Sequence, residues 1–113
     1  EIFNNLFCND NRFIIQKEIG MSSWFGFSMI INPSWDIKRK DIIYHLDKNN
    51  IESRPIVTGN FAKNEVLKFF NYEIFDTLKN AEILDKNGFF VGNSHEDLTN
   101  EISYLKNVLE KFN

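Results

Sequence analysis

The chain has 113 residues and a formal net charge of −3 at pH 7, which fits a single domain with a modest core. Hydrophobic residues make up 42% of it, as in globular rather than disordered proteins. The absence of a basic excess argues against nucleic acid as a partner, and the apolar runs are too short to span a membrane. A single cysteine, Cys8, gives neither a disulfide framework nor a cysteine-based metal site. The single cysteine, together with the lack of a signal-peptide pattern, favours a cytoplasmic location.

Apolar spacing predicts a short helix near residue 2 and a strand start at 13–15, then a longer strand over residues 22–31. The bulky face of the longer strand should pack on helices, and it contains Phe25, Phe27, Met29 and Ile31. Its other face includes Gly26, for which two readings stay open: close backbone packing or room for a ligand.

Residues 36–49 predict a helix, capped by Ser34 or Asp36, with His45 on its exposed side. Its buried stripe consists of Ile42, Ile43 and Leu46. A second strand should cover residues 51–57, followed by a polar loop at 58–61.

The sequence after residue 61 predicts further helices on both sides of a third strand. Asn64 should cap a short helix that ends at residue 70, and helical spacing resumes from Ile74 toward Leu84. Asn87 and Gly88 predict a turn, and a strand should follow over residues 89–93. Thr99 should cap a last helix. The apolar positions of this helix are Ile102, Leu105, Leu109 and Phe112. The expected fold class is therefore a two-layer α/β domain, a small sheet packed with helices.

Arg54 is the candidate binding residue that stands out from the sequence alone. Pro55 favours extended geometry at Arg54, and the loop of Thr58, Gly59 and Asn60 follows closely. A guanidinium beside exposed backbone N–H groups suits an anionic or hydroxyl-rich ligand. The competing reading is an arginine paired with a surface carboxylate at a strand edge.

Other catalytic signals are weak. His95 has Glu96 and Asp97 as chain neighbours, but adjacency does not make a triad. Two histidines fifty residues apart do not indicate a metal site, and no P-loop, dinucleotide fingerprint or nucleophile elbow is present.

Three stretches together resemble the C-terminal part of the vitamin-B6-dependent nucleotide-sugar aminotransferase and dehydratase family. They are residues 22–27 (Ser-Ser-Trp-Phe-Gly-Phe), residues 51–61 (Ile-Glu-Ser-Arg-Pro-Ile-Val-Thr-Gly-Asn-Phe) and residues 80–93, Asn-Ala-Glu-Ile-Leu-Asp-Lys-Asn-Gly-Phe-Phe-Val-Gly-Asn. The likeness runs from about Ser22 to the end of the chain. It is greatest to the sugar 3-dehydratases, because Arg54 leads into Thr58-Gly59-Asn60 rather than a Pro-x-His segment.

The resemblance implies a parent enzyme with the fold of type I aminotransferases. A large N-terminal domain would hold pyridoxal or pyridoxamine phosphate, and a small C-terminal domain would close over a GDP- or CDP-4-keto-6-deoxyhexose. The family works as homodimers with active sites near the subunit interface. Since the chain starts at Glu1 and contains no cofactor-anchoring segment, residues 1–113 are expected to be the small domain alone, inactive by itself and without catalytic residues.

Carried over by position, the resemblance places Arg54 near the sugar nucleotide and Thr58, Gly59 and Asn60 in the loop beside it. Asn93 and His95 are secondary binding candidates.

Three functions follow from these expectations. The first is part of a 3-dehydratase for O-antigen or lipopolysaccharide deoxysugars. The second is part of a sugar aminotransferase, which would carry lysine rather than histidine at the cofactor position. The third is a stand-alone binding module without catalysis.

Overall fold

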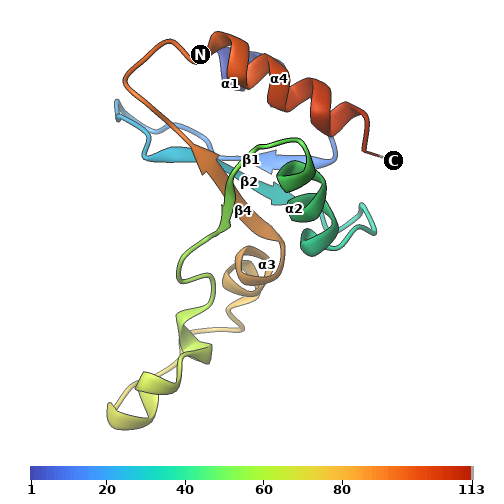
Figure 1. Cartoon of the computed structure of the whole chain (residues 1–113). Helices are drawn as coiled ribbons and strands as arrows, with labels where there is room; N and C mark the ends of the chain where they lie inside the picture. The colour runs from blue at the N-terminus through green and yellow to red at the C-terminus, as the bar shows by residue number, and fades with distance from the viewer. Residues whose placement is uncertain (113) are drawn as a thin grey trace.

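The computed structural model describes residues 1–112, and a four-stranded antiparallel sheet lies at its centre (Figure 1). The strands are β1 (Phe13–Ile15), β2 (Gly26–Ile31), β3 (Ser53–Pro55) and β4 (Gly88–Gly92), in the order β1-β2-β4-β3. The expected strands are confirmed, but those expected at 22–31 and 51–57 are shorter than predicted. The sheet therefore has β2 and β4 in its middle and β3 at one edge.

Four helices pack around this sheet: α1 (Ile2–Phe7), α2 (Arg39–Lys48), α3 (Lys79–Asn87) and α4 (Thr99–Glu110). Helices α1 and α4 lie side by side over one face, and α3 lies against the other (Figure 1). The predicted fold class, a small sheet packed with helices, is confirmed. Within residues 1–112, no helix combines the length and apolar character that a membrane crossing requires.

One hydrophobic core joins the sheet to α1, α2 and α4. The predicted stripes are largely confirmed, because Ile42 and Leu46 of α2 are fully buried and α4 buries its expected apolar face. Burying a large apolar side chain is worth about 1.5–3 kcal/mol, so this cluster supplies most of the stabilisation. Its members are Phe3, Phe7, Phe13, Met29, Ile31, Ile42, Leu46, Phe89, Val91, Ile102, Leu105, Val108 and Leu109.

Two expectations for α2 are wrong. Neither Ser34 nor Asp36 caps it, because Lys38 occupies the cap position with no side-chain hydrogen bond, and the Ser34 backbone N–H donates to Asn32 instead. His45 is half-buried rather than exposed. One of its ring nitrogens lies 2.9 Å from the Val108 carbonyl oxygen, and the ring meets Phe112 edge-on. His45 thus joins α2 to α4.

Two further boundaries differ from the sequence prediction. There is no turn at Asn87 and Gly88, because Asn87 ends α3 and Gly88 begins β4. The Asn87 side chain instead donates to the Ile31 carbonyl of the neighbouring strand. At α4, Thr99 is the first helical residue rather than the cap, and its backbone N–H donates to the Asp97 carboxylate.

Residues 61–78 form a segment that we call the arm, which projects from the body below α3 (Figure 1). It contains two short 3-10 helices, η1 (Phe61–Lys63) and η2 (Glu65–Phe69), and Asn64 caps the second as predicted. The helical continuation expected from Ile74 is wrong, since α3 begins at Lys79. The radius of gyration is 15.5 Å, whereas a compact domain of this length has roughly 13 Å.

Candidate functional site

Arg54 lies in the edge strand β3, directly opposite Phe90 of β4. The extended geometry predicted from Pro55 is therefore confirmed. The Arg54 side chain is 69% exposed and forms an ion pair with Glu52 at 2.8 Å. Because both side chains are exposed, this ion pair adds little to the stability of the fold. An anionic ligand could therefore replace Glu52 as the partner of the guanidinium with little loss of stability.

A pocket of about 300 Å³ brings Arg54 and Asn93 together, although they are far apart in the sequence. Asn93 follows β4, and its side-chain amide donates to the Trp24 carbonyl oxygen at 2.7 Å. This bond fixes the loop after β4 against the segment that precedes β2. The pocket thus presents one cation and one amide beside the rings of Phe25 and Phe90.

Phe25 is the main pocket residue that sequence reasoning missed. It was expected to be buried with the strand, but it is 87% exposed and its ring lies 5.8 Å from that of Phe90. The strand begins only at Gly26, where an added Cβ would meet the Phe90 ring and the Val91 carbonyl at 2.8 Å. Close packing is therefore the correct reading of Gly26, and this glycine was the available signal for an irregular strand start.

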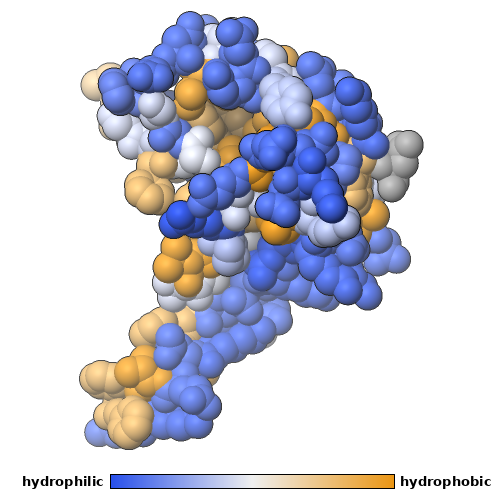
Figure 2. Space-filling model, viewed as in Figure 1, coloured by the Kyte–Doolittle hydropathy of each residue, from blue (hydrophilic) through white to orange (hydrophobic). Residues whose placement is uncertain are grey.

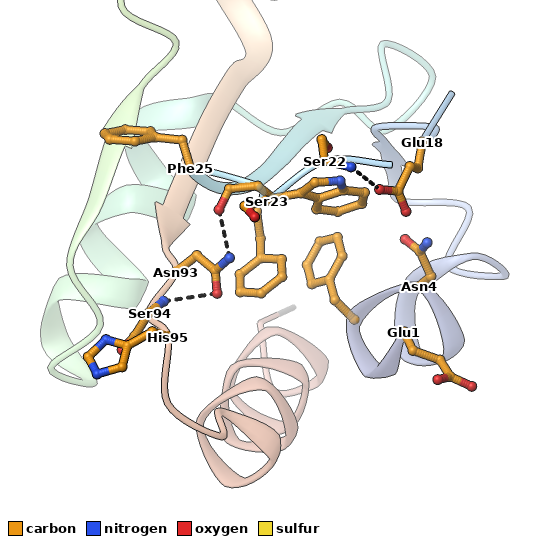
Figure 3. Close-up of a pocket in the computed structure, with 12 residues that line it drawn as sticks. Glu1, Asn4, Glu18, Ser22, Ser23, Phe25, Asn93, Ser94 and His95 are labelled. Atoms are coloured by element: carbon orange, nitrogen blue, oxygen red, sulfur yellow. Dashed lines mark hydrogen bonds between the residues drawn. The ribbon is translucent and has the colours of Figure 1, made fainter. Parts of the chain in front are cut away.

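Phe25 also borders a larger pocket of about 860 Å³ (Figure 3). Asn93, Ser94 and His95 come from one side of this pocket, and Asn4 and Glu18 lie across it (Figure 3). Aromatic side chains complete its lining, namely Phe3, Trp24 and Phe27. His95 is exposed here and does not line the pocket of Arg54. Phe25 and Asn93 line both pockets.

The predicted loop residues do not lie in the pocket of Arg54. Thr58 lines a separate hollow of about 510 Å³, whose wall again includes Phe25 and Phe90. Gly59 has φ +42°, and a Cβ there would lie 2.6 Å from the Asp85 Cα. Gly59 therefore allows the loop to pack closely against α3.

Asn60 holds the same loop in place. Its side-chain oxygen accepts from the Ala62 backbone N–H, which caps η1, and its amide donates to Glu82 at 3.3 Å. Gly59 and Asn60 thus have visible structural roles, because the Gly59 backbone packs against α3 and the Asn60 amide donates to a residue of α3.

A small ion-pair network secures the base of the arm on α3. The Lys63 ammonium lies 2.6 Å from Glu82 and 3.2 Å from Asp85. Hydrogen bonds from Lys63 lower the pKa of both carboxyl groups, and hydrogen bonds to Glu82 and Asp85 raise the pKa of Lys63. All three groups stay charged at neutral pH. In the described part of the chain, no three acidic, histidine or cysteine side chains converge on a metal site.

Comparisons with known proteins place these features in context. No protein-family model matches the chain. GDP-4-keto-6-deoxy-D-mannose 3-dehydratase from Escherichia coli O55:H7 is 49% identical over 111 residues, which is 97% of this chain and 29% of the relative. The chain is homologous to the C-terminal part of this 3-dehydratase. It spans less than a third of the length of the curated relatives it matches.

Solved dehydratase structures carry the same fold. The E. coli dehydratase with bound hydrated PLP has a TM-score of 0.92 and 49% identity, covering 96% of this chain and 28% of that one. A dehydratase variant with bound GDP-perosamine gives a TM-score of 0.91 with the same identity and coverage. The resemblance that the three stretches indicated is thereby confirmed.

Proposed function

We propose that this chain is the small C-terminal domain of a pyridoxamine- or pyridoxal-phosphate-dependent GDP-4-keto-6-deoxyhexose 3-dehydratase that closes over the sugar nucleotide. The observation that carries the proposal is 49% identity across 97% of the chain to such an enzyme. The parent enzyme serves deoxysugar synthesis for O-antigen or lipopolysaccharide. It is a cytoplasmic homodimer, and a preceding domain binds the cofactor.

The pocket of Arg54 supports a binding role toward the sugar nucleotide. A guanidinium offers a planar fork of donors that matches phosphate oxygens. Among residues 1–112, Arg54 is held only by the exposed Glu52. The rings of Phe25 and Phe90 give the pocket an apolar wall. In our proposal, Arg54 leaves Glu52 for an oxygen of the sugar nucleotide, and Asn93 offers its amide from the opposite loop.

The cofactor does not fit the residues of this pocket. Its lining contains neither the lysine nor the histidine that the family places at the cofactor. When bound in the parent enzyme, the cofactor supplies the electron sink for removal of the C3 hydroxyl. This chain contributes binding and positioning of the sugar nucleotide.

The decisive experiment is to determine the coding sequence before Glu1, express the full-length protein, and assay it with GDP-4-keto-6-deoxymannose. We expect a preceding cofactor domain with histidine at the cofactor position and formation of a 3-deoxy product.

Lysine at that position with an amino-sugar product would replace the proposal by an aminotransferase. A start codon at Glu1 would leave a non-catalytic module and remove the enzyme assignment.

A further inference from the structure

A second pocket, of about 540 Å³, lies between the start of α2 and the end of α3, and we call it the basic pocket. Its lining contains four of the chain's 13 lysine and arginine residues, namely Lys38, Arg39, Lys40 and Lys86. The surface where α2 and α3 meet is largely hydrophilic, whereas apolar residues gather at the tip of the arm (Figure 2). A hollow of this size is typical of small-ligand sites.

The basic pocket is separate from the pocket of Arg54. Pro33, which follows β2, and Asn87, which precedes β4, line the basic pocket. The pocket of Arg54 includes Phe25 before β2 and Asn93 after β4. The two pockets therefore lie at opposite ends of the two central strands, and a ligand of one does not occupy the other.

The charges of the basic pocket are unbalanced. Its three lysines form neither an ion pair nor a side-chain hydrogen bond within residues 1–112. Two carboxylates also line it, but Glu82 is already bound by Lys63 at 2.6 Å. Asp36 is then the carboxylate left to face four cations. A hollow lined mainly by one sign of charge concentrates ions of the other sign.

Arg39 gives the basic pocket a fixed frame. One of its guanidinium nitrogens donates to the carbonyl oxygens of Asp85 at 2.7 Å and Gly88 at 3.0 Å. These carbonyl groups lie at the C-terminal end of α3, whose partial negative charge would otherwise repel an anion. Arg39 thus joins α2 to α3 and neutralises that end. Because the backbones that carry the lysines are held together without a ligand, less ordering has to accompany binding.

We infer that the basic pocket binds a small anion of the phosphate or diphosphate class. Each lysine supplies a compact point charge with three donors, and three such groups suit an anion that carries several charges on closely spaced oxygens. A small anion fits better than nucleic acid, because the chain as a whole has a net charge of −3. The inference goes beyond the proposed function and does not depend on it.

Methyl NMR of the full-length protein, titrated with sodium pyrophosphate, tests the inference. Ile37 and Ile83 line the basic pocket, so their methyl groups report on an occupant. Ile37→Val and Ile83→Val variants assign the two signals. Ile14 of β1 is the control, because it is 46% exposed and lies outside the pocket lining. We expect saturable shifts at Ile37 and Ile83 and none at Ile14. Sodium chloride of matched ionic strength should leave all three signals in place.

Charge variants show which residues bind the anion. The double variant Lys38→Gln/Lys86→Gln should raise the dissociation constant for pyrophosphate by roughly 10-fold or more, the scale of losing hydrogen bonds between charged groups. Lys17→Gln is the matched control, because Lys17 is an exposed lysine outside the lining. It should bind like wild type, and so should Arg54→Ala.

Four results would overturn the inference: no saturable shift, an equal response to chloride, wild-type affinity in the double variant, or loss of the response in Arg54→Ala. The last result would assign the anion to the pocket of Arg54. Thermal unfolding checks that the double variant is folded. If it is not, Lys38→Gln and Lys86→Gln are titrated singly, and each should weaken binding several-fold. Wild-type affinity in both single variants would likewise overturn the inference.

Discussion

Lys106 on α4 donates to the carboxylate of Asp10 at 2.7 Å, joining the turn after α1 to a helix 96 residues later. Arg12 binds the same carboxylate at 2.8 Å and donates to the Leu109 carbonyl oxygen near the end of α4. The Asp10 side chain is only 6% exposed. Hydrogen bonds from Arg12, and then from Lys106, hold the pKa of Asp10 well below its ordinary value.

We predict that Asp10→Asn lowers the free energy of unfolding by about 2 kcal/mol at pH 7, the scale of hydrogen bonds to a charged group. The folded-state pKa of Asp10 is depressed. Its contribution is therefore complete above the unfolded-state pKa of about 3.9 and is lost as the pH falls toward the folded-state pKa. The gap between wild type and variant should narrow between about pH 5 and pH 2.

Urea unfolding at several pH values measures this gap. Glu65→Gln is the control, because its pair with Lys68 is exposed on both sides and should change stability by less than about 0.5 kcal/mol. A constant gap across the acid range would contradict the role given to Asp10.

Gly59→Ala should destabilise the chain, whereas Gly92→Ala should be nearly neutral. Gly59 has φ +42°, and a methyl group there would meet the Asp85 backbone, while nothing lies within 4 Å of the corresponding position at Gly92. Left-handed strain and the clash together should cost about 1–3 kcal/mol. Thermal unfolding of both variants checks the contrast, and equal melting temperatures would contradict the packing of this loop on α3.

Arg54→Ala in the full-length enzyme should raise KM or lower kcat for the sugar nucleotide by roughly 10-fold or more, as loss of a charged contact does. Lys48→Ala is the charge-matched control, because Lys48 lies on α2 and lines none of the pockets that contain Arg54 or Thr58. Steady-state measurement of KM and kcat for both variants tests this prediction. Unchanged kinetics for Arg54→Ala would remove its binding role.

Phe75→Ser should leave the unfolding free energy of the 113-residue chain within about 0.5 kcal/mol of wild type, as exposed substitutions do. Phe89→Ala should cost about 3–5 kcal/mol, as emptied core sites do, since Phe89 is fully buried. Denaturant melts of the two variants give the comparison. A large loss for Phe75→Ser would mean that the arm tip packs on the body of the domain.

The sequence predicted best where periodic burial decides the structure. Ile42 and Leu46, like Leu105 and Leu109, repeat at helical spacing because one helix face meets the core. The strand at Arg54 was predictable because Pro55 restricts its neighbour.

The errors fall where a distant contact decides the outcome. Phe25 lies outside the strand, which begins at Gly26 against the Phe90 ring. Asn87 stays helical, and its side chain donates to the Ile31 carbonyl oxygen. The meeting of Arg54 and Asn93 in one pocket depends on the pairing of β3 with β4, which local sequence does not encode. The binding candidates themselves came from family resemblance, because their residue types alone suit many surfaces.

The contact between α1 and α4 has a consequence for how the protein is made. Helix α1 has six residues, too few to persist alone in water, and its buried Phe3 and Phe7 belong to the core that α4 completes. During synthesis, α4 leaves the ribosome well after α1, so these two aromatic side chains stay uncovered until α4 has emerged. The contact joins two segments that are far apart in the sequence, α1 and α4, which makes it a late and slow step of folding.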